Sequence, residues 1–195
     1  GSIGFRHLQS FLKSKYYLEI YVIEKNKDRI LKVKDIIQYN KNNKIKFFFS
    51  NNLRNFQISF YLAIVATNSG QRLDSIKILL KQNNITYLIL EKLLSSNIVN
   101  LKKMQKFISK QKTNIYVNTP RRFMQIYRDI KKQINKNDLV SISFSGSGWN
   151  FSSNAIHFID LFVFLSANKN LKKGSFRISD KIISKRKGYS EFYGS

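Results

Sequence analysis

The sequence predicts an α/β fold in which helices cover a mainly parallel sheet. Short apolar runs of strand length alternate with segments whose apolar residues recur at helical spacing, the order expected for strands joined by crossover helices. A hydrophobic fraction of 43% gives these 195 residues enough apolar surface to bury a core. Cysteine is absent, which excludes disulfides and thiolate zinc sites and suits a cytoplasmic protein.

The first part of the chain, up to Thr119, contains the clearest alternation of strands and helices. Helical faces are expected around Leu8, Val33, Ile76 and Met104, and Asn26 is placed to cap the second of these helices. The run before Thr67 is the most hydrophobic, which is typical of a buried strand. The expected strands are 18–23, 45–49, 58–66, 85–90 and 115–117.

The pattern changes after Thr119, where we expect a domain boundary. A basic amphipathic helix should begin at Pro120, because Phe123, Tyr127, Ile130 and Ile134 share one face. A strand over 139–144, a helix over 156–165 and a strand over 175–183 are expected to follow. Residues 1–119 are therefore expected to form one domain, and 120–195 the beginning of an α+β domain.

The chain is strongly basic, with 35 Lys and Arg against 11 Asp and Glu and a formal charge of +24. Such a charge raises nucleic acid or an anionic membrane as partners. The basic residues are spread along the sequence, and a genome rich in A and T would favour Lys codons, although this does not explain why acidic residues are scarce. The longest apolar run, 156–167, is interrupted by His157 and Asp160 and is shorter than the ~20 residues that cross a bilayer, so no membrane partner is expected.

The first sign of function is the segment Gly1-Ser2-Ile3-Gly4, which opens a helix. Glu24 follows Gly4 by 20 positions, after the next strand, and this is the spacing of a Rossmann dinucleotide-binding unit. Glycines there let the backbone approach a pyrophosphate, and the carboxylate binds the adenosine ribose. The strand that would precede these glycines is absent from the sequence, so we expect a sheet that lacks its first strand. Taken alone, two glycines and one Glu are better explained as a helix cap beside an exposed carboxylate.

Four segments in order resemble the glucose-fructose oxidoreductase/inositol dehydrogenase/MocA family. Gly1-Ser2-Ile3-Gly4-Phe5-Arg6-His7-Leu8 is similar to the family's glycine turn, and Ala66-Thr67-Asn68-Ser69 to its Ala-Thr turn. Leu90-Glu91-Lys92 resembles its Glu-Lys-Pro motif, and the segment from Gly148-Trp149-Asn150 to Asp160 resembles the part that carries the catalytic His.

The resemblance implies an oxidoreductase that transfers a hydride between a sugar or sugar-nucleotide hydroxyl and NAD or NADP. Glu24 favours NAD, because its charge would repel a 2′-phosphate, whereas Lys25 and Lys27 weaken that preference. Lys92 would stabilise an alkoxide and His157 would exchange the proton. The implied residues are Lys92 and His157 for catalysis, Gly1, Ser2, Ile3, Gly4, Glu24, Thr67, Asn68 and Glu91 for the cofactor, and Arg122, Tyr127 and Asn154 for the substrate; no metal is implied.

The sequence also departs from the family at positions that matter for chemistry. Ser153 stands where an acidic residue usually lies four positions before the His, and Leu93 replaces the proline of the Glu-Lys-Pro motif. Asp160, one helical turn after His157, could orient the imidazole, but in the family this residue is more often structural. Whether the chain is an enzyme therefore stays open. The alternatives are a nucleotide-binding remnant without catalysis and, as the least favoured, a basic nucleic-acid-binding protein; the family's second domain also allows a homo-oligomer.

Overall fold

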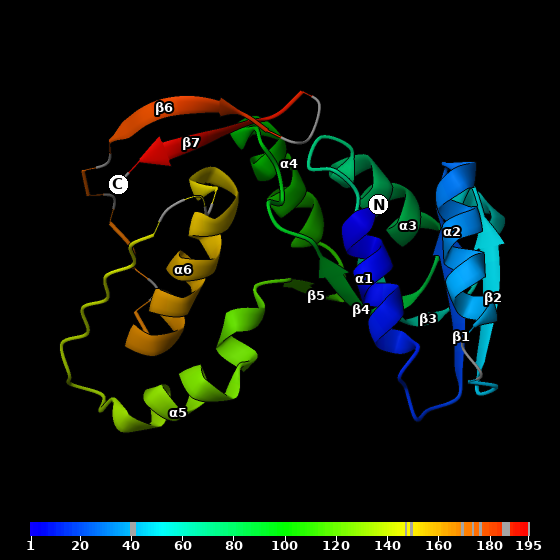
Figure 1. Ribbon diagram of the computed structural model, residues 1–195, viewed down its shortest axis with the longest axis horizontal. Coiled ribbons are helices and arrows are strands. Elements are labelled where there is room, and N and C mark those ends of the chain that lie inside the picture. Colours follow the sequence, from blue (N-terminus) through cyan, green and yellow to red (C-terminus); the bar gives the residue numbers. More distant parts are fainter. Residues whose placement is uncertain are drawn as a thin grey trace. The chain divides into compact units, whose positions relative to one another are not determined.

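The computed structural model describes residues 1–39, 42–146, 148, 150–168, 170–172, 174–175, 177–184 and 188–194. The chain forms two compact units, Gly1–Val117 and Asn118–Ser195, whose elements are labelled in Figure 1. The first unit ends at Val117, two residues before Thr119, where the sequence pattern predicts a domain boundary. Trp149, in the segment that resembles the family's catalytic region, and Phe176, in the expected strand 175–183, lie outside the described residues.

The first unit alternates helices and strands in the expected order. Its strands begin and end within two residues of the expected ranges. The largest difference is in the hydrophobic run before Thr67, where the strand begins at Phe60 instead of residue 58; the last strand begins at Asn114, one residue early. The elements are α1 (Ser2–Phe11), β1 (Leu18–Ile23), α2 (Lys27–Gln38), β2 (Ile45–Ser50), the 3₁₀ turn η1 (Leu53–Asn55), β3 (Phe60–Val65), α3 (Arg72–Gln82), β4 (Ile85–Leu90), α4 (Ile98–Ile108) and β5 (Asn114–Val117).

The strands form two parallel sheets rather than one. β1 pairs with β2, and β4 lies between β3 and β5, but β1 and β3 are not paired with each other. A Rossmann sheet has the strand order 3-2-1-4-5-6, and removing strand 1 leaves a pair and a triplet in this same arrangement. The predicted class, an α/β fold with a Rossmann-like parallel sheet that lacks its first strand, is confirmed.

Local signals explain where the helices begin. The expected cap at Asn26 is confirmed, because its side-chain oxygen accepts a hydrogen bond from the Arg29 N–H at 3.0 Å. Asn97 caps α4 in the same way, with acceptor distances of 2.7 Å to the Val99 N–H and 3.3 Å to the Asn100 N–H. Each cap satisfies backbone donors that the first turn of a helix leaves unpaired.

The core of the first unit lies around the central strand β4. Leu88 and Leu90 are fully buried there, together with Ile76 of α3 and Met104 of α4. β1 and β2 build a second, aromatic cluster, in which Tyr21 stacks on Phe48 at 4.6 Å and meets the edges of two further rings, Phe56 at 4.9 Å and Phe60 at 5.4 Å.

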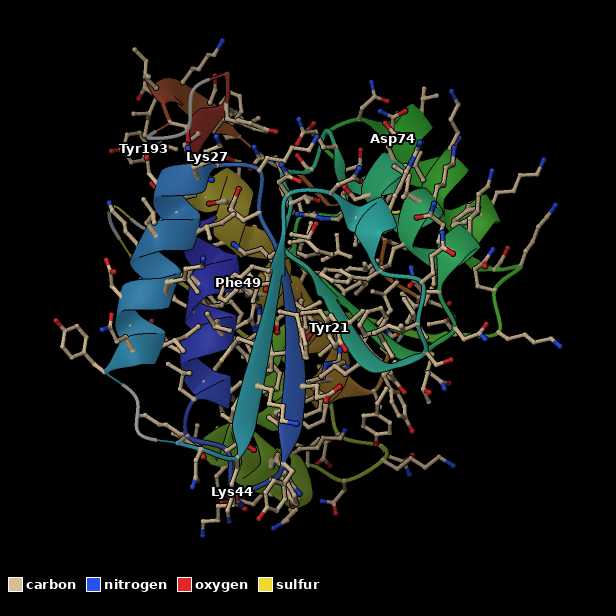
Figure 2. The ribbon with its side chains drawn as sticks, turned by 90° about the vertical axis from the view of Figure 1, so that its right-hand side faces the viewer. Tyr21, Lys27, Lys44, Phe49, Asp74 and Tyr193 are labelled. Atoms are coloured by element: carbon tan, nitrogen blue, oxygen red, sulfur yellow. The ribbon has the colours of Figure 1, made fainter. Side chains whose placement is uncertain are left out.

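The two sides of the β1–β2 pair are covered differently. Figure 2 shows α1 and α2 on one side of these strands. The Phe49 ring of β2 lies on that side, with the Lys34 ammonium of α2 5.5 Å from its centre. The Tyr21 ring points to the other side, toward the start of β3. β1 is therefore packed on both faces while its backbone edge beside β3 stays unpaired.

The second unit contains η2 (Pro120–Phe123), α5 (Gln125–Gln133), α6 (Phe151–Ser166), β6 (Ile178–Ile183) and β7 (Ser190–Gly194). α6 begins five residues before the expected start and buries Leu161 and Leu165. β6 and β7 form an antiparallel pair, and β7 was not expected. The expected strand at 139–144 is wrong, because this segment has no regular structure and Leu139 is 99% exposed. None of the helices in the described residues has the length and hydropathy needed to cross a membrane.

Candidate functional site

The carboxyl ends of three parallel strands define the candidate site of the first unit. Glu24 directly follows β1, Ala66 follows β3, and Glu91 follows β4. Ligands of open parallel sheets bind at this end of the strands, where loops and helix N-termini present their polar groups. Residues in the amino-terminal part of helix α1 contact each of these ends, as the next three contacts show.

The first contact joins the glycine turn to the acidic residue predicted for the ribose. The Gly1 amino group donates to Glu24 Oε2 at 2.7 Å, and the Asn26 N–H donates to Oε1 at 3.2 Å. Arg29 lies 3.7 Å from the same carboxylate. Burial raises the pKa of the Glu24 carboxyl, but the two hydrogen bonds and the charges of Gly1 and Arg29 outweigh it, so the pKa falls below its ordinary value. Glu24 is therefore held as an anion beside the turn.

The second contact places the turn against the end of β3. A Cβ atom built on Gly4 would lie 3.5 Å from the Ala66 Cβ, which is ordinary van der Waals contact. Thr67 and Asn68 follow, and Asn68 is exposed while the Thr67 Oγ1 is buried with no hydrogen-bond partner among the described residues. Buried hydroxyls normally have a partner, so this orphaned oxygen is consistent with a polar ligand at the strand end.

The third contact fixes the segment that carries Lys92. The Glu91 side chain is 8% exposed, and its Oε1 lies 2.7 Å from His7 Nε2 of α1. Its backbone N–H donates to the Val65 carbonyl at 3.1 Å, so the end of β4 is tied to the end of β3. Lys92 itself is half-buried, and the peptide bond between Lys92 and Leu93 is cis.

Arg72 of α3, which the sequence analysis did not single out, joins the turn after β3 to the turn after β4. It is 3% exposed, and its guanidinium donates to the carbonyls of both Thr67 and Leu93. A planar guanidinium with five donors can bridge two carbonyls from one position, which a lysine cannot do in the same way. The three contacts of α1 and this bridge bring together the cofactor residues predicted at Gly1 to Gly4, Glu24, Thr67, Asn68 and Glu91.

In the second unit, His157 lies on α6 with its Nδ1 atom buried. Asp160, on the same helix, accepts two hydrogen bonds from the Arg122 guanidinium of η2, one of them from Nε at 2.9 Å. Arg122 also lies 5.7 Å from the centre of the Phe164 ring. The Asp160 carboxylate therefore holds η2 against α6, and Arg122, predicted to bind substrate, uses two of its donors in this pair.

The start of α6 has a carboxylate that the sequence pattern did not predict. Glu191 of β7 accepts a hydrogen bond from the Ser152 hydroxyl, and its Oε2 lies 3.3 Å from the Ser153 backbone nitrogen, which donates to it. An acidic residue was expected at the position of Ser153. In the structure, the carboxylate at this turn is that of Glu191, from strand β7. Of the other predicted substrate residues, Asn154 lies in the first turn of α6 and Tyr127 lies on α5. The Asn154 side-chain amide donates to the Asn150 carbonyl at 3.4 Å.

Two other features of the described residues lie outside this picture. An open hollow of about 640 Å³ is lined by residues at the amino ends of β3 and β4, such as Ser59, Asn84 and Thr86. The hollow takes no part in the candidate site, because it lies at the amino ends of the strands, whereas Glu24 and Glu91 follow the carboxyl ends. No group of three or more His, Asp or Glu side chains among the described residues could hold a metal ion.

Comparison with solved structures identifies proteins of the same fold. A putative myo-inositol dehydrogenase from Sinorhizobium meliloti superposes with a TM-score of 0.67 at 15% identity, over 94% of this chain and 57% of that chain. The dehydrogenase MviM from Clostridium difficile superposes with a TM-score of 0.59 at 20% identity, over 98% of this chain and 61% of that chain. The transcriptional regulator Gal80p from Kluyveromyces lactis gives 0.65 at 17% identity, over 91% and 50%.

These similarities are structural, since neither a family model nor a curated protein sequence matches the chain. The chain spans between 50% and 61% of the length of the three solved structures.

Proposed function

Because the chain has the fold of the glucose-fructose oxidoreductase/inositol dehydrogenase/MocA-type dehydrogenases, we propose that it binds NAD or NADP. We propose further that it serves the oxidation or reduction of a hydroxyl on a sugar or sugar nucleotide. The observation that carries the proposal is the position of α1 at the carboxyl ends of the strands, where Gly4 lies beside Ala66 after β3 and His7 Nε2 lies 2.7 Å from Glu91 Oε1 after β4.

The residues around this contact suit a dinucleotide. The first-turn N–H groups of α1 and the helix dipole favour a pyrophosphate, and Gly4 of this turn lies beside Ala66. The Glu24 carboxylate, kept ionised by its neighbours, can accept hydrogen bonds from ribose hydroxyls. The nicotinamide ring supplies the hydride chemistry when the cofactor is bound.

The chain's own residues would supply charge and a proton. Lys92 follows β4 at the same end of the sheet, where its ammonium can stabilise a developing alkoxide. His157 is proposed to take or give the proton of the substrate hydroxyl, which suits an imidazole near neutral pH. Arg122, Tyr127 and Asn154 are proposed to contact the sugar, with Arg122 limited to the donors that Asp160 does not use.

Titration with NADH and NADPH, followed by nicotinamide fluorescence, tests the cofactor site. The wild-type chain should bind NADH saturably. Gly4→Asp places a carboxylate against the pyrophosphate, and like charges about 4 Å apart near a protein surface repel by about 4 kcal/mol, so the affinity should fall by more than about tenfold.

Gly4→Ala is the matched control for this titration. Its methyl group makes only ordinary contact with Ala66, so the helix should be preserved and the affinity should change much less than in the Asp variant. If the wild-type chain binds neither cofactor, the proposal is wrong. Equal losses in both variants would show that the loss does not come from charge.

A second candidate function, nucleotide binding without catalysis, is favoured by two observations. Ser153 replaces the expected acidic residue before His157, and a solved structure of similar fold is named a transcriptional regulator. The two candidates differ in turnover. An enzyme should oxidise NADH in the presence of a keto-sugar and lose this activity in His157→Asn, whereas a binding protein should bind NADH and turn over none of a panel of sugars.

A further inference from the structure

The segment around Lys92 is held from both sides by residues of other elements. On the amino side, the Glu91 carboxylate contacts His7 of α1 at 2.7 Å. On the carboxyl side, the Leu93 carbonyl accepts a hydrogen bond from the buried Arg72 guanidinium of α3. Lys92 therefore lies between two anchors, one from the helix that follows the glycine turn and one from the helix that follows β3.

The two anchoring residues, Arg72 and His7, connect the Lys92 segment to different elements. Arg72 also donates to the Thr67 carbonyl, so its anchor connects one strand-end turn to another within the sheet. His7 lies in the helix that begins at the glycine turn, and its side chain is 25% exposed while that of Glu91 is 8% exposed. The donor role in this hydrogen bond is assigned to His7 Nε2, because a carboxylate oxygen accepts.

Helix α1 meets the strand ends through apolar and polar contacts. The helix buries Leu8, places Gly4 beside Ala66, and sets its amino end beside Glu24. The His7–Glu91 hydrogen bond is a polar link from this helix to the end of β4. A ligand that fixes the glycine turn would act on Lys92 through it.

We propose that His7 is a positioning residue for Lys92, because its imidazole holds the Glu91 carboxylate and so transmits the position of α1 to the lysine. The proposal deepens the proposed function and rests on it, since the ligand at the turn is the dinucleotide. Binding of the dinucleotide then orders α1, and the ordered helix sets the direction of the Lys92 ammonium. His7 itself does not contact the reacting atoms in this arrangement.

The reactivity of the Lys92 amine tests the proposal without knowledge of the substrate. The wild-type chain and variants are labelled with a limiting amount of acetic anhydride, and the labelling rate of Lys92 is measured by peptide mass spectrometry relative to the exposed Lys132. Losing the His7 link should free the half-buried lysine, so His7→Ala should raise the relative rate by about threefold or more, the factor expected when a hydrogen bond of ordinary net strength is lost.

Two variants separate positioning from a general loss of structure. His7→Gln keeps an N–H at the place of Nε2 and should restore the wild-type rate. Arg6→Gln changes the neighbouring, exposed residue of the same helix and should leave the rate unchanged. If His7→Ala does not fold, as judged by circular dichroism, Glu91→Leu removes the acceptor from the other side of the pair at similar volume and should raise the rate in its place.

The same samples distinguish failure of this proposal from failure of the proposed function. NADH binding to the wild-type chain is followed by fluorescence and tests the function. NADH should lower the labelling of Lys92 in the wild-type and His7→Gln chains but not in His7→Ala. An unchanged Lys92 rate in a folded His7→Ala chain would overturn the role of His7, whatever the result of the NADH titration.

Discussion

The environment of Glu24 makes the stability of the chain depend on pH in a defined direction. The pKa of its carboxyl lies below the ordinary value of 4.5 in the folded chain. A lowered folded-state pKa stabilises the fold above the unfolded-state pKa, and this contribution is lost as the pH falls through the folded-state pKa. Glu24→Gln should therefore melt at a lower temperature than wild type from pH 7 to about pH 5, with a difference that shrinks below about pH 4.5.

Thermal unfolding followed by circular dichroism from pH 3 to pH 7 measures this difference. Glu19→Gln, which changes an exposed carboxylate on the same strand, is the control for the loss of a negative charge in so basic a chain. A melting-temperature difference for Glu24→Gln that does not vary with pH would contradict the expected stabilisation by the ionised form.

Single residues of the site divide into those that a motif can reveal and those that only the fold reveals. Gly4, Glu24 and Lys92 stand in local patterns whose spacing is readable in one dimension. His7 and Glu91 are 84 positions apart, and their hydrogen bond arises only when the fold brings α1 beside the end of β4. Glu191 likewise reaches the start of α6 from a strand 38 positions beyond Ser153. No sequence periodicity links such pairs.

At the scale of one element, the start of α4 depends on a single side chain. Asn97 accepts hydrogen bonds from the N–H groups of Val99 and Asn100. Asn97→Ala should lower the free energy of unfolding by about 1 kcal/mol, because two backbone donors lose their acceptor. Asn97→Asp keeps a side-chain oxygen at this position and should cost much less.

Urea unfolding of the two variants measures this cost, with Ser96→Ala as a control at the exposed neighbouring position. Equal destabilisation by Ala and Asp would show that the acceptor oxygen is not what Asn97 contributes. The core residue Met104 lies on the same helix, so the midpoint should report the unit that contains α4.

The elements of the first unit were predictable because their own residues decide them. β4 is mainly apolar, and the Asn26 and Asn97 side chains mark helix starts by local hydrogen bonds. The segment 139–144 alternates apolar and polar residues as a strand does, but a strand also needs a partner, and none pairs with it. β7 is only five residues long, and its antiparallel pairing with β6 is what makes it a strand; Gly188, two residues before it, has φ of 81°.

At the scale of the whole architecture, the division between β1 and β3 is the main feature. Both strands are mainly apolar, as central strands of parallel sheets are, yet among the described residues each pairs with a strand on one side only. The Tyr21 ring reaches Phe60 across the division, so side chains cover it while backbone groups do not pair. An unpaired edge presents a row of N–H and C=O groups, which other strands can bind.

Hydrogen exchange measured by NMR tests this division directly. In β1 and β3, the amides directed toward the paired neighbour should be protected, and those directed toward the division should exchange much faster, because opening them costs almost no free energy. β4 is the internal control, since it is paired on both sides and lies in the core. Uniform protection along β1 and β3 would mean that the two strands pair with each other in solution and that the sheet is continuous. Alternating protection in both strands would establish two parallel sheets separated between β1 and β3.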